Sequence, residues 1–232
     1  MLEALREDVY KANMLLVQYG LVQFTWGNVS GIDREKGLVV IKPSGVAYDE
    51  LTPENMVVVD LKGNKIEGAL SPSVDMPTHI CLYNNFPEIG GIVHTHSKWA
   101  TIWAQAGRPI PPYGTTHADF AYGPIPCTRE LSKLQLETDY ELNTGKIIAQ
   151  FFQENSIDPQ AVPAVLVKSH GPFTWGSDCF KAVENAAMLE DIAMMAKHTE
   201  SLADAHPIEQ YLLDKHYLRK HGSNATYGQK TT

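Results

Sequence analysis

Ile89-Gly-Gly-Ile-Val-His-Thr-His-Ser97 is an apolar run that ends in two histidines separated by a single residue. Its first part, Ile89–Val93, predicts a buried β-strand. Successive side chains of a strand point to opposite faces, so His94 and His96 emerge on the same side, about 7 Å apart at ~3.3 Å per residue. Two imidazoles at this separation can converge on one metal ion. The same pair is also typical of a strand that simply ends in polar residues.

Two residues outside this stretch favour the metal site. Asp75 lies upstream, within Pro72-Ser-Val-Asp-Met-Pro-Thr-His79, and His170 follows a second β-branched apolar run at 164–168. Three histidines and a carboxylate at the ends of short strands suit a catalytic Zn²⁺ or a similar divalent ion, such as Mn²⁺ or Co²⁺. His79, four residues after Asp75, is expected to pack in the interior or to cap a helix. The sequence therefore predicts a metal site formed by Asp75, His94, His96 and His170.

The bulk composition excludes several classes of protein. With 232 residues, of which 44% are hydrophobic, the chain is long enough for one large domain with an ample core. Its formal net charge of −8 argues against nucleic acid as a partner. No apolar run approaches the ~20 residues of a membrane span, and the acidic, amphipathic N-terminus has neither signal-peptide nor transit-peptide form. The three cysteines lack a Cys-x-x-Cys pair, which favours a reducing, cytoplasmic location over a disulfide framework.

Hydrophobic periodicity predicts helices and strands of unequal length along a single domain that spans residues 1–232. One clear hairpin turn, at 62–64, and the uneven alternation favour an α/β fold with a mixed, largely antiparallel central sheet sandwiched by helices. The polar tail at 222–232 is expected to contribute to a site. We expect helices at 2–19, 78–85, 100–106, 145–155, 179–202 and 208–221, strands at 38–42, 56–60, 89–93 and 164–168, and turns or loops at 25–33 and 107–130.

Several turns in the first half of the chain are suited to a phosphate group. Gly27-Asn28 is a close-approach turn, Ser44-Gly45 follows a strand and Lys42, and Ser73 stands two residues before Asp75. Backbone N–H groups and hydroxyls hold phosphate in proteins that lack a P-loop. Each turn alone is ordinary turn chemistry, but three beside the metal residues predict a joint site. No G-x-G-x-x-G follows a strand and no P-loop motif occurs, so we expect no nucleotide cofactor.

Two groups near the end of the chain are candidates for proton transfer and anion binding. Asp119 lies in a segment too short and irregular for a core element, where it either caps a turn or acts as a general acid/base near the metal. The basic stretch 214–221 precedes Tyr227. Such charge runs are typical of a solvated helix face. As a hypothesis, the basic helix end and Tyr227 complete the anionic site of a neighbouring subunit.

These residues belong to a longer series of short motifs, in one order, from the first helix to Gln229. The series resembles the class II aldolase/adducin family and, within it, the sugar-phosphate 4-epimerases. The motifs are Trp26–Ser30, Lys42–Gly45, Asp75–His79, Gly91–Ser97, Thr101–Gly107, Gly114–Asp119, Ile125–Arg129, Ser169–Phe173, Lys215–Gly222 and Tyr227–Gln229.

The resemblance implies a class II aldolase-like fold and a set of residue roles. It implies a divalent metal, usually zinc, on His94, His96 and His170 with Asp75 as a further ligand, and a homotetramer with sites between subunits. Tyr227 would arrive from the adjacent chain and act with Asp119 as an acid/base pair. Where the family has two small hydroxyl residues before the acid, this chain has Ser73-Val74, so we expect the phosphate to rely there on the Val74 N–H. The phosphate-binding set is then Gly27, Asn28, Lys42, Ser44, Gly45, Ser73 and Val74.

The implied activity is 4-epimerisation of L-ribulose 5-phosphate to D-xylulose 5-phosphate. No carbonyl neighbours C4, and the chain has no nicotinamide motif, so we expect inversion by cleavage and reformation of the C3–C4 bond. A metal would stabilise the enediolate across C2 and C3 while glycolaldehyde phosphate rotates. Since the C4 oxygen then points the other way, Asp119 and Tyr227 are expected on opposite sides. Two alternative functions are an aldolase for fuculose or rhamnulose 1-phosphate and a non-enzymatic, adducin-like binding module. The sequence does not distinguish among arabinose, ascorbate and other pentose pathways.

Overall fold

The computed structural model describes residues 2–202, 204–222 and 225–226. One seven-stranded sheet, in the order β4-β3-β2-β1-β5-β7-β6, runs through the molecule. The helices of the described chain are α1 (Glu3–Gln18), α2 (Met76–Asn85), α3 (Lys98–Ala106), α4 (Thr115–Phe120), α5 (Lys133–Glu137), α6 (Tyr140–Glu154), α7 (Cys179–Leu202) and α8 (Gln210–His221). Short 3₁₀ turns lie at Tyr48–Glu50 and Pro53–Asn55. Its strands are β1 (Asn28–Asp33), β2 (Leu38–Ile41), β3 (Val57–Asp60), β4 (Lys65–Glu67), β5 (Gly91–His94), β6 (Ala164–Val167) and β7 (Gly171–Gly176).

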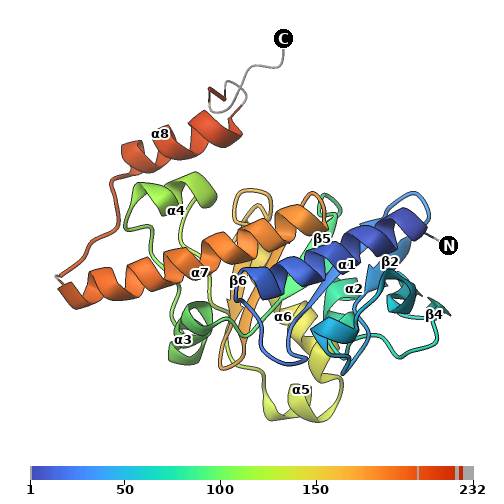
Figure 1. Cartoon of the computed structure of the whole chain (residues 1–232). Helices are drawn as coiled ribbons and strands as arrows, with labels where there is room; N and C mark the ends of the chain where they lie inside the picture. Colours follow the sequence, from blue (N-terminus) through green and yellow to red (C-terminus); the bar gives the residue numbers. More distant parts are fainter. Residues whose placement is uncertain (1, 203, 223–224, 227–232) are drawn as a thin grey trace.

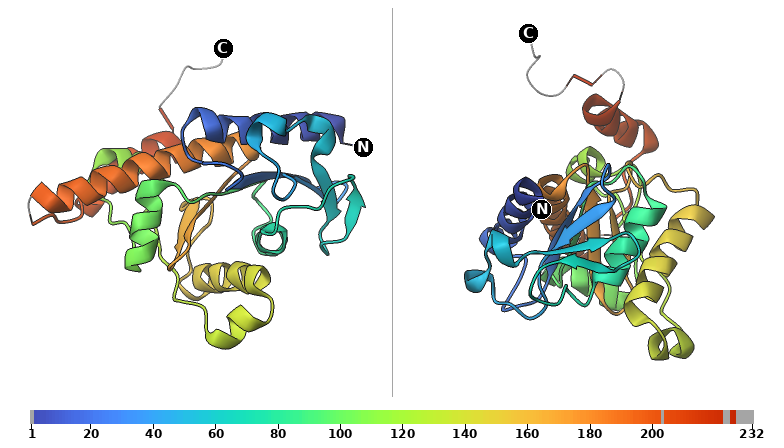
Figure 2. Two further views of the ribbon diagram at one scale, coloured as in Figure 1. Left: turned by 60° about the horizontal axis from the view of Figure 1, so that its bottom comes forward. Right: turned by 90° about the vertical axis from the view of Figure 1, so that its right-hand side faces the viewer.

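Helices cover both faces of this sheet. Figure 1 and Figure 2 show α1 and α7 side by side on one face, with α2 and α6 on the other. The side chains of successive strand residues alternate between the two faces: Ile92 belongs to the core under α2 and α6, and Val93 to the core under α1 and α7. Burial on both faces explains the continuous apolar strand sequences.

The structure confirms the predicted fold class. The sheet lies between helices, as expected, and each of its six strand pairings is antiparallel. The expected strands at 38–42, 56–60, 89–93 and 164–168 are β2, β3, β5 and β6.

Several elements were not predicted, and they share polar or glycine-containing sequences. The expected turn at 25–33 contains β1, a central strand between β2 and β5, and β7 was likewise missed. The predicted loop at 107–130 contains α4, α5 follows shortly after it, and α6 begins at Tyr140 rather than at 145. Asn28 and Ser30 of β1 are buried because distant groups bond to them, which no local periodicity reports.

Two further sequence inferences concern membranes and disulfides. No helix in the described part of the chain combines the length and apolar character needed to cross a bilayer. Cys81, Cys127 and Cys179 are all free thiols, as expected from their number and spacing.

Gly91 allows β5 to lie directly against the start of α7. A Cβ atom at this position would stand 2.4 Å from the carbonyl carbon of Asp178 and 2.4 Å from Cα of Cys179. These are backbone atoms, so Gly91→Ala is expected to lower the free energy of unfolding by about 3 kcal/mol, the upper range for overpacking. Urea unfolding measures the change. At Gly114 the added Cβ meets nothing within 4 Å, so Gly114→Ala should cost less than about 1 kcal/mol, and equal losses in the two variants would contradict this account.

Candidate metal centre and the loops around it

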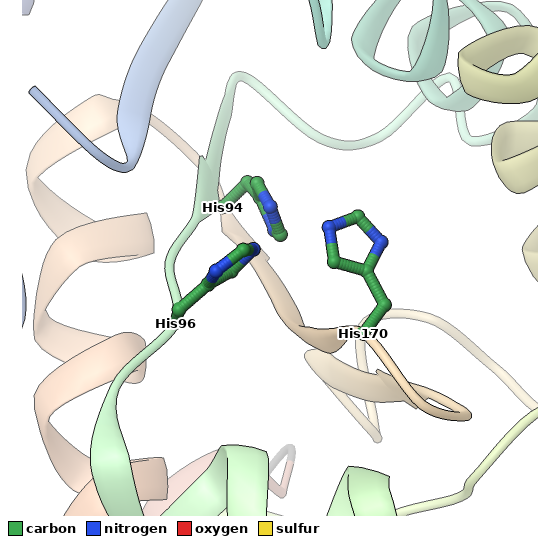
Figure 3. Close-up of side chains that lie close together, drawn as sticks. All are labelled: His94, His96 and His170. Carbon is green, nitrogen blue, oxygen red and sulfur yellow. The ribbon is translucent and has the colours of Figure 1, made fainter.

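Three histidines converge at one end of the sheet, as Figure 3 shows. His94 ends β5, His96 follows two residues later, and His170 lies in the turn between β6 and β7. Each offers a ring nitrogen, and these nitrogens lie within 4.8 Å of one another. The ring centroids are 4.7 Å apart for His94 and His170, and 5.0 Å apart for each of the other two pairs.

The ring of His94 is fixed by its surroundings. Its Nδ1 lies 3.0 Å from the carbonyl oxygen of Pro172, so Nδ1–H donates to that oxygen. The ring also stacks on Phe173 at a centroid distance of 4.2 Å. The neutral tautomer with the proton on Nδ1 leaves the Nε2 lone pair free, and this is the arrangement in which an outer hydrogen bond orients a metal-binding histidine.

His170 is positioned by a partner that the sequence did not reveal. Its Nδ1 lies 3.1 Å from the hydroxyl oxygen of Tyr140, the first residue of α6. Ser169, immediately before it, has a φ of 63°, a left-handed conformation that is costly for a residue other than glycine. A strained turn and a tyrosine hydroxyl together direct the His170 ring toward the other two.

The pKa shifts of His96 and His170 suit metal binding. Burial, together with the neighbouring His94 and His96, lowers the pKa of His170 to about 3. Burial and His94 also lower the pKa of His96. Neutral imidazoles with free nitrogens are the form that coordinates a divalent ion. The donor set therefore fits Zn²⁺ or a similar ion.

Asp75 lies beside the three histidines, but its carboxylate is not one of the ligand groups that lie within 4.8 Å of one another. It precedes the first residue of α2, and its Oδ2 accepts a hydrogen bond of 2.7 Å from Nδ2 of Asn28. Burial raises the pKa of Asp75, but His94, His79 and the bond from Asn28 together lower it more, so the net pKa lies below its ordinary value. At neutral pH the side chain is therefore an ionised carboxylate, close enough to His94 and His170 for their charges to interact with it.

The turns proposed for phosphate binding meet next to Asp75. Asn28 also donates to Oγ of Ser73 at 3.1 Å, and the backbone N–H of Asp75 donates to the same oxygen at 3.3 Å. The hydroxyl of Ser73 thus accepts twice and keeps its own proton for another acceptor. The side chain of Val74 is 64% exposed. Ser44 and Gly45 are exposed on the neighbouring turn, where the N–H of Ser44 donates to the carbonyl of Ser71.

Lys42 links two of these turns by hydrogen bonds from its side chain to their backbone. Its side chain is buried, and Nζ donates to the carbonyl oxygens of Val46 at 2.8 Å and Thr25 at 3.3 Å. It also lies over the ring of Tyr48, 4.9 Å from the centroid. Burial lowers the pKa of Lys42 to about 8.

Gly27 brings its turn close to His94, one of the three converging histidines. It has a φ of 79°, and a Cβ there would lie 2.6 Å from Val22 Cγ1 and 3.1 Å from the carbonyl oxygen of His94. Only glycine combines this backbone conformation with such a close approach.

Asp119 lies on α4 and contacts α8. Its carboxylate accepts hydrogen bonds from His216 at 3.0 Å and from Arg219 at 2.9 Å, and it forms an ion pair with Lys220 at 3.3 Å. Burial raises its pKa, while Arg219, His216 and Lys220 together lower it more, so the net pKa is below its ordinary value. In both Figure 1 and Figure 2, α8 lies outside the layers around the sheet. Tyr227 lies outside the described residues, as does most of the tail at 222–232.

His117 has a structural role two residues before Asp119. The ring is buried, and its Nε2 lies 2.7 Å from the carbonyl oxygen of Gly123, to which it donates. Burial lowers its pKa to about 4 from 6.5. The unfolded chain therefore binds more protons between pH 6.5 and pH 4, so stability decreases as the pH falls through this range.

This effect predicts that the unfolding free energies of the original chain and of His117→Gln respond differently to pH. The glutamine side chain keeps a donor toward Gly123. At 1.36 kcal/mol per pKa unit, the original chain is expected to lose roughly 2–3 kcal/mol more unfolding free energy than the variant between pH 7 and pH 4.5. Urea titrations at the two pH values measure this difference. Parallel losses in the two proteins would show that His117 does not contribute.

The sequence of this chain is similar to that of a known protein family and of known enzymes. Residues 7–196 match the family described as the Class II Aldolase and Adducin N-terminal domain. An L-ribulose-5-phosphate 4-epimerase (UlaF) from Salmonella paratyphi C (strain RKS4594) is 54% identical over 230 residues, covering 99% of this chain and 100% of the relative. The enzyme of the same name from Salmonella typhi is 53% identical with the same coverage.

Solved structures agree on the fold. An L-fuculose 1-phosphate aldolase superposes with a TM-score of 0.78 at 23% identity, covering 92% of this chain and 94% of the aldolase. The L-fuculose-1-phosphate aldolase from Thermus thermophilus gives 0.65 at 23% identity, covering 89% of this chain and 100% of that one. At these identities the likeness establishes the architecture alone.

Proposed function

We propose that this chain, which belongs to the class II aldolase and adducin family, epimerises L-ribulose 5-phosphate at C4 to give D-xylulose 5-phosphate. The observation that carries the proposal is the convergence of the ring nitrogens of His94, His96 and His170 within 4.8 Å beside the half-buried carboxylate of Asp75. The identity to the Salmonella epimerases along the whole chain supports the substrate. The three free thiols support a cytosolic setting.

The reaction breaks and reforms one carbon–carbon bond. A base takes the proton from the C4 hydroxyl, the C3–C4 bond breaks, and its electron pair moves into the C2–C3 unit. Glycolaldehyde phosphate rotates and presents the other face of its carbonyl, and the bond reforms as an acid returns a proton to the C4 oxygen. A divalent ion such as Zn²⁺, Mn²⁺ or Co²⁺, held by the three histidines with Asp75, would supply Lewis acidity at the C2 and C3 oxygens.

The turns around Asp75 are proposed to hold the phosphate throughout the rotation. Gly27 and Gly45 would offer backbone N–H groups, and Ser44 and Ser73 their hydroxyl protons. The buried Nζ of Lys42 bonds to the carbonyls of Thr25 and Val46 and so keeps two of these turns in place. Asn28 and the backbone N–H of Val74 complete the proposed phosphate site.

The proton-transfer groups are proposed to come from a neighbouring subunit. Asp119 is held by α8, and α8 lies outside the body of its own chain. A homotetramer in which the α4–α8 unit and Tyr227 reach the adjacent histidine cluster would place an acid and a base on opposite sides of C4. We expect a small sugar phosphate to be the substrate, and neither nucleic acid nor a nucleotide to take part.

NMR in D₂O tests this function directly. Metal-replete protein incubated with L-ribulose 5-phosphate is expected to form D-xylulose 5-phosphate that keeps protium at C4, because the C4 hydrogen becomes a non-exchanging aldehyde hydrogen. Accumulating glycolaldehyde phosphate, or cleavage of fuculose or rhamnulose 1-phosphate instead, would make the chain an aldolase. Deuterium at C4 would contradict cleavage of the C3–C4 bond.

A further inference from the structure

A buried histidine that the mechanism does not use stands directly behind Asp75. His79 is fully buried on α2, and its Nδ1 lies 2.7 Å from Oγ of Ser30. That oxygen lies 2.8 Å from the hydroxyl oxygen of Tyr83, one turn further along α2. These three polar groups form a continuous chain through the core beneath the metal centre.

The other ring nitrogen of His79, Nε2, takes no part in this hydrogen-bond network. Nε2 is buried and has no hydrogen-bond partner among the described residues. A buried donor without a partner costs about 1–3 kcal/mol, and native proteins contain few of them. Burial lowers the pKa of His79 to about 3, so a charged ring does not explain the arrangement.

The position of His79 on α2 indicates where this nitrogen is directed. His79 stands four residues after Asp75, so the two side chains lie on the same face of the helix. Helical side chains lean toward the N-terminus, which carries the His79 ring over the turn that begins at Asp75. The ring also approaches Phe173 at a centroid distance of 6.2 Å, and Phe173 stacks on His94. His79 is therefore enclosed between the core and the metal centre.

We propose that His79 is a positioning residue, whose Nε2–H donates to the Asp75 carboxylate when a divalent ion is bound and holds it in the orientation that the ion needs. In this arrangement the Tyr83 hydroxyl donates to Ser30, the Ser30 hydroxyl donates to Nδ1, and the proton of the neutral ring stays on Nε2. Asn28 already donates to Oδ2 of the same carboxylate. The inference rests on the metal-dependent function proposed above, because the support matters only when Asp75 takes part in binding the ion.

Two conservative variants separate this role from simple packing. In His79→Asn the amide replaces Nδ1, so the bond to Ser30 is kept and the donor toward Asp75 is lost. In His79→Gln the amide replaces Nε2, so a donor toward Asp75 is kept. Both are titrated with Co²⁺ in competition with a chelator, the visible spectrum of the bound Co²⁺ is recorded, and thermal unfolding of the metal-free proteins measures structural damage.

His79→Asn is expected to raise the Kd for Co²⁺ by about 10- to 100-fold, the usual effect of losing an outer-shell partner, and to change the Co²⁺ spectrum. His79→Gln should stay within about threefold of the original Kd. Equal Kd values for the two variants, whether both unchanged or both raised, would overturn the proposal, whatever happens to the melting temperatures. If the unsubstituted chain does not bind Co²⁺, the metal-dependent function fails as well.

Discussion

Replacing His94 with asparagine is expected to reduce turnover of L-ribulose 5-phosphate by at least about 10³-fold and to lower bound metal well below one ion per chain. The asparagine amide can still donate to the carbonyl of Pro172, as Nδ1 does at 3.0 Å in the present structure. What it lacks is the Nε2 lone pair. Metal-assisted charge stabilisation contributes several kcal/mol, and each 1.36 kcal/mol is a factor of ten in rate.

Metal analysis and kinetics on the same preparation decide the outcome. His206→Asn is the matched control, because His206 is exposed before α8 and has no place in the proposed site. It should keep both metal and turnover. A His94→Asn protein that is less stable but keeps full metal content would mean that the histidine is structural.

Tyr227→Phe and Asp119→Asn are expected to reduce turnover by about 10²- to 10⁴-fold each, the usual contribution of a general acid or base. Neither change removes a proposed metal ligand, so bound metal should stay at the level of the unsubstituted chain. Asp119→Asn additionally weakens the contacts with His216, Arg219 and Lys220 that hold α8 against α4.

A variant on the same helix controls for damage to α8. Tyr211 is 74% exposed there, and Tyr211→Phe should leave turnover unchanged. The assignment of the acid/base pair fails if Tyr227→Phe and Asp119→Asn both retain near-normal epimerisation. Measuring both reaction directions also shows which residue serves which epimer, since each group is proposed to act on one face of C4.

The parts of the molecule that were predictable are those with local patterns. The apolar run Ile89–Val93 predicted β5, and the alternation of strand side chains predicted the shared direction of His94 and His96, whose rings lie 5.0 Å apart. Apolar runs and helical periods placed β2, β3, β6 and α7 in the same way. These features depend only on residues close together in the chain.

The parts that were missed depend on contacts between distant residues. Ser30 is buried in a central strand because His79 and Tyr83, about fifty positions later, supply its hydrogen bonds. Tyr140 orients His170 across 30 positions and had no sequence signal of its own. Asp119 was placed in a loop, whereas it lies in α4, and its ion pairs come from α8 about 100 positions away. Tertiary contacts of this kind override local propensity.

The central claim is that three histidines hold a divalent ion without which C4 is not inverted. The most direct measurement follows D-xylulose 5-phosphate formation from L-ribulose 5-phosphate with a coupled enzyme, before and after dialysis against a chelator, with metal content determined in parallel. The account predicts that activity falls in proportion to bound metal and returns when Zn²⁺, Mn²⁺ or Co²⁺ is added back. Full activity in protein shown to contain no metal would contradict it.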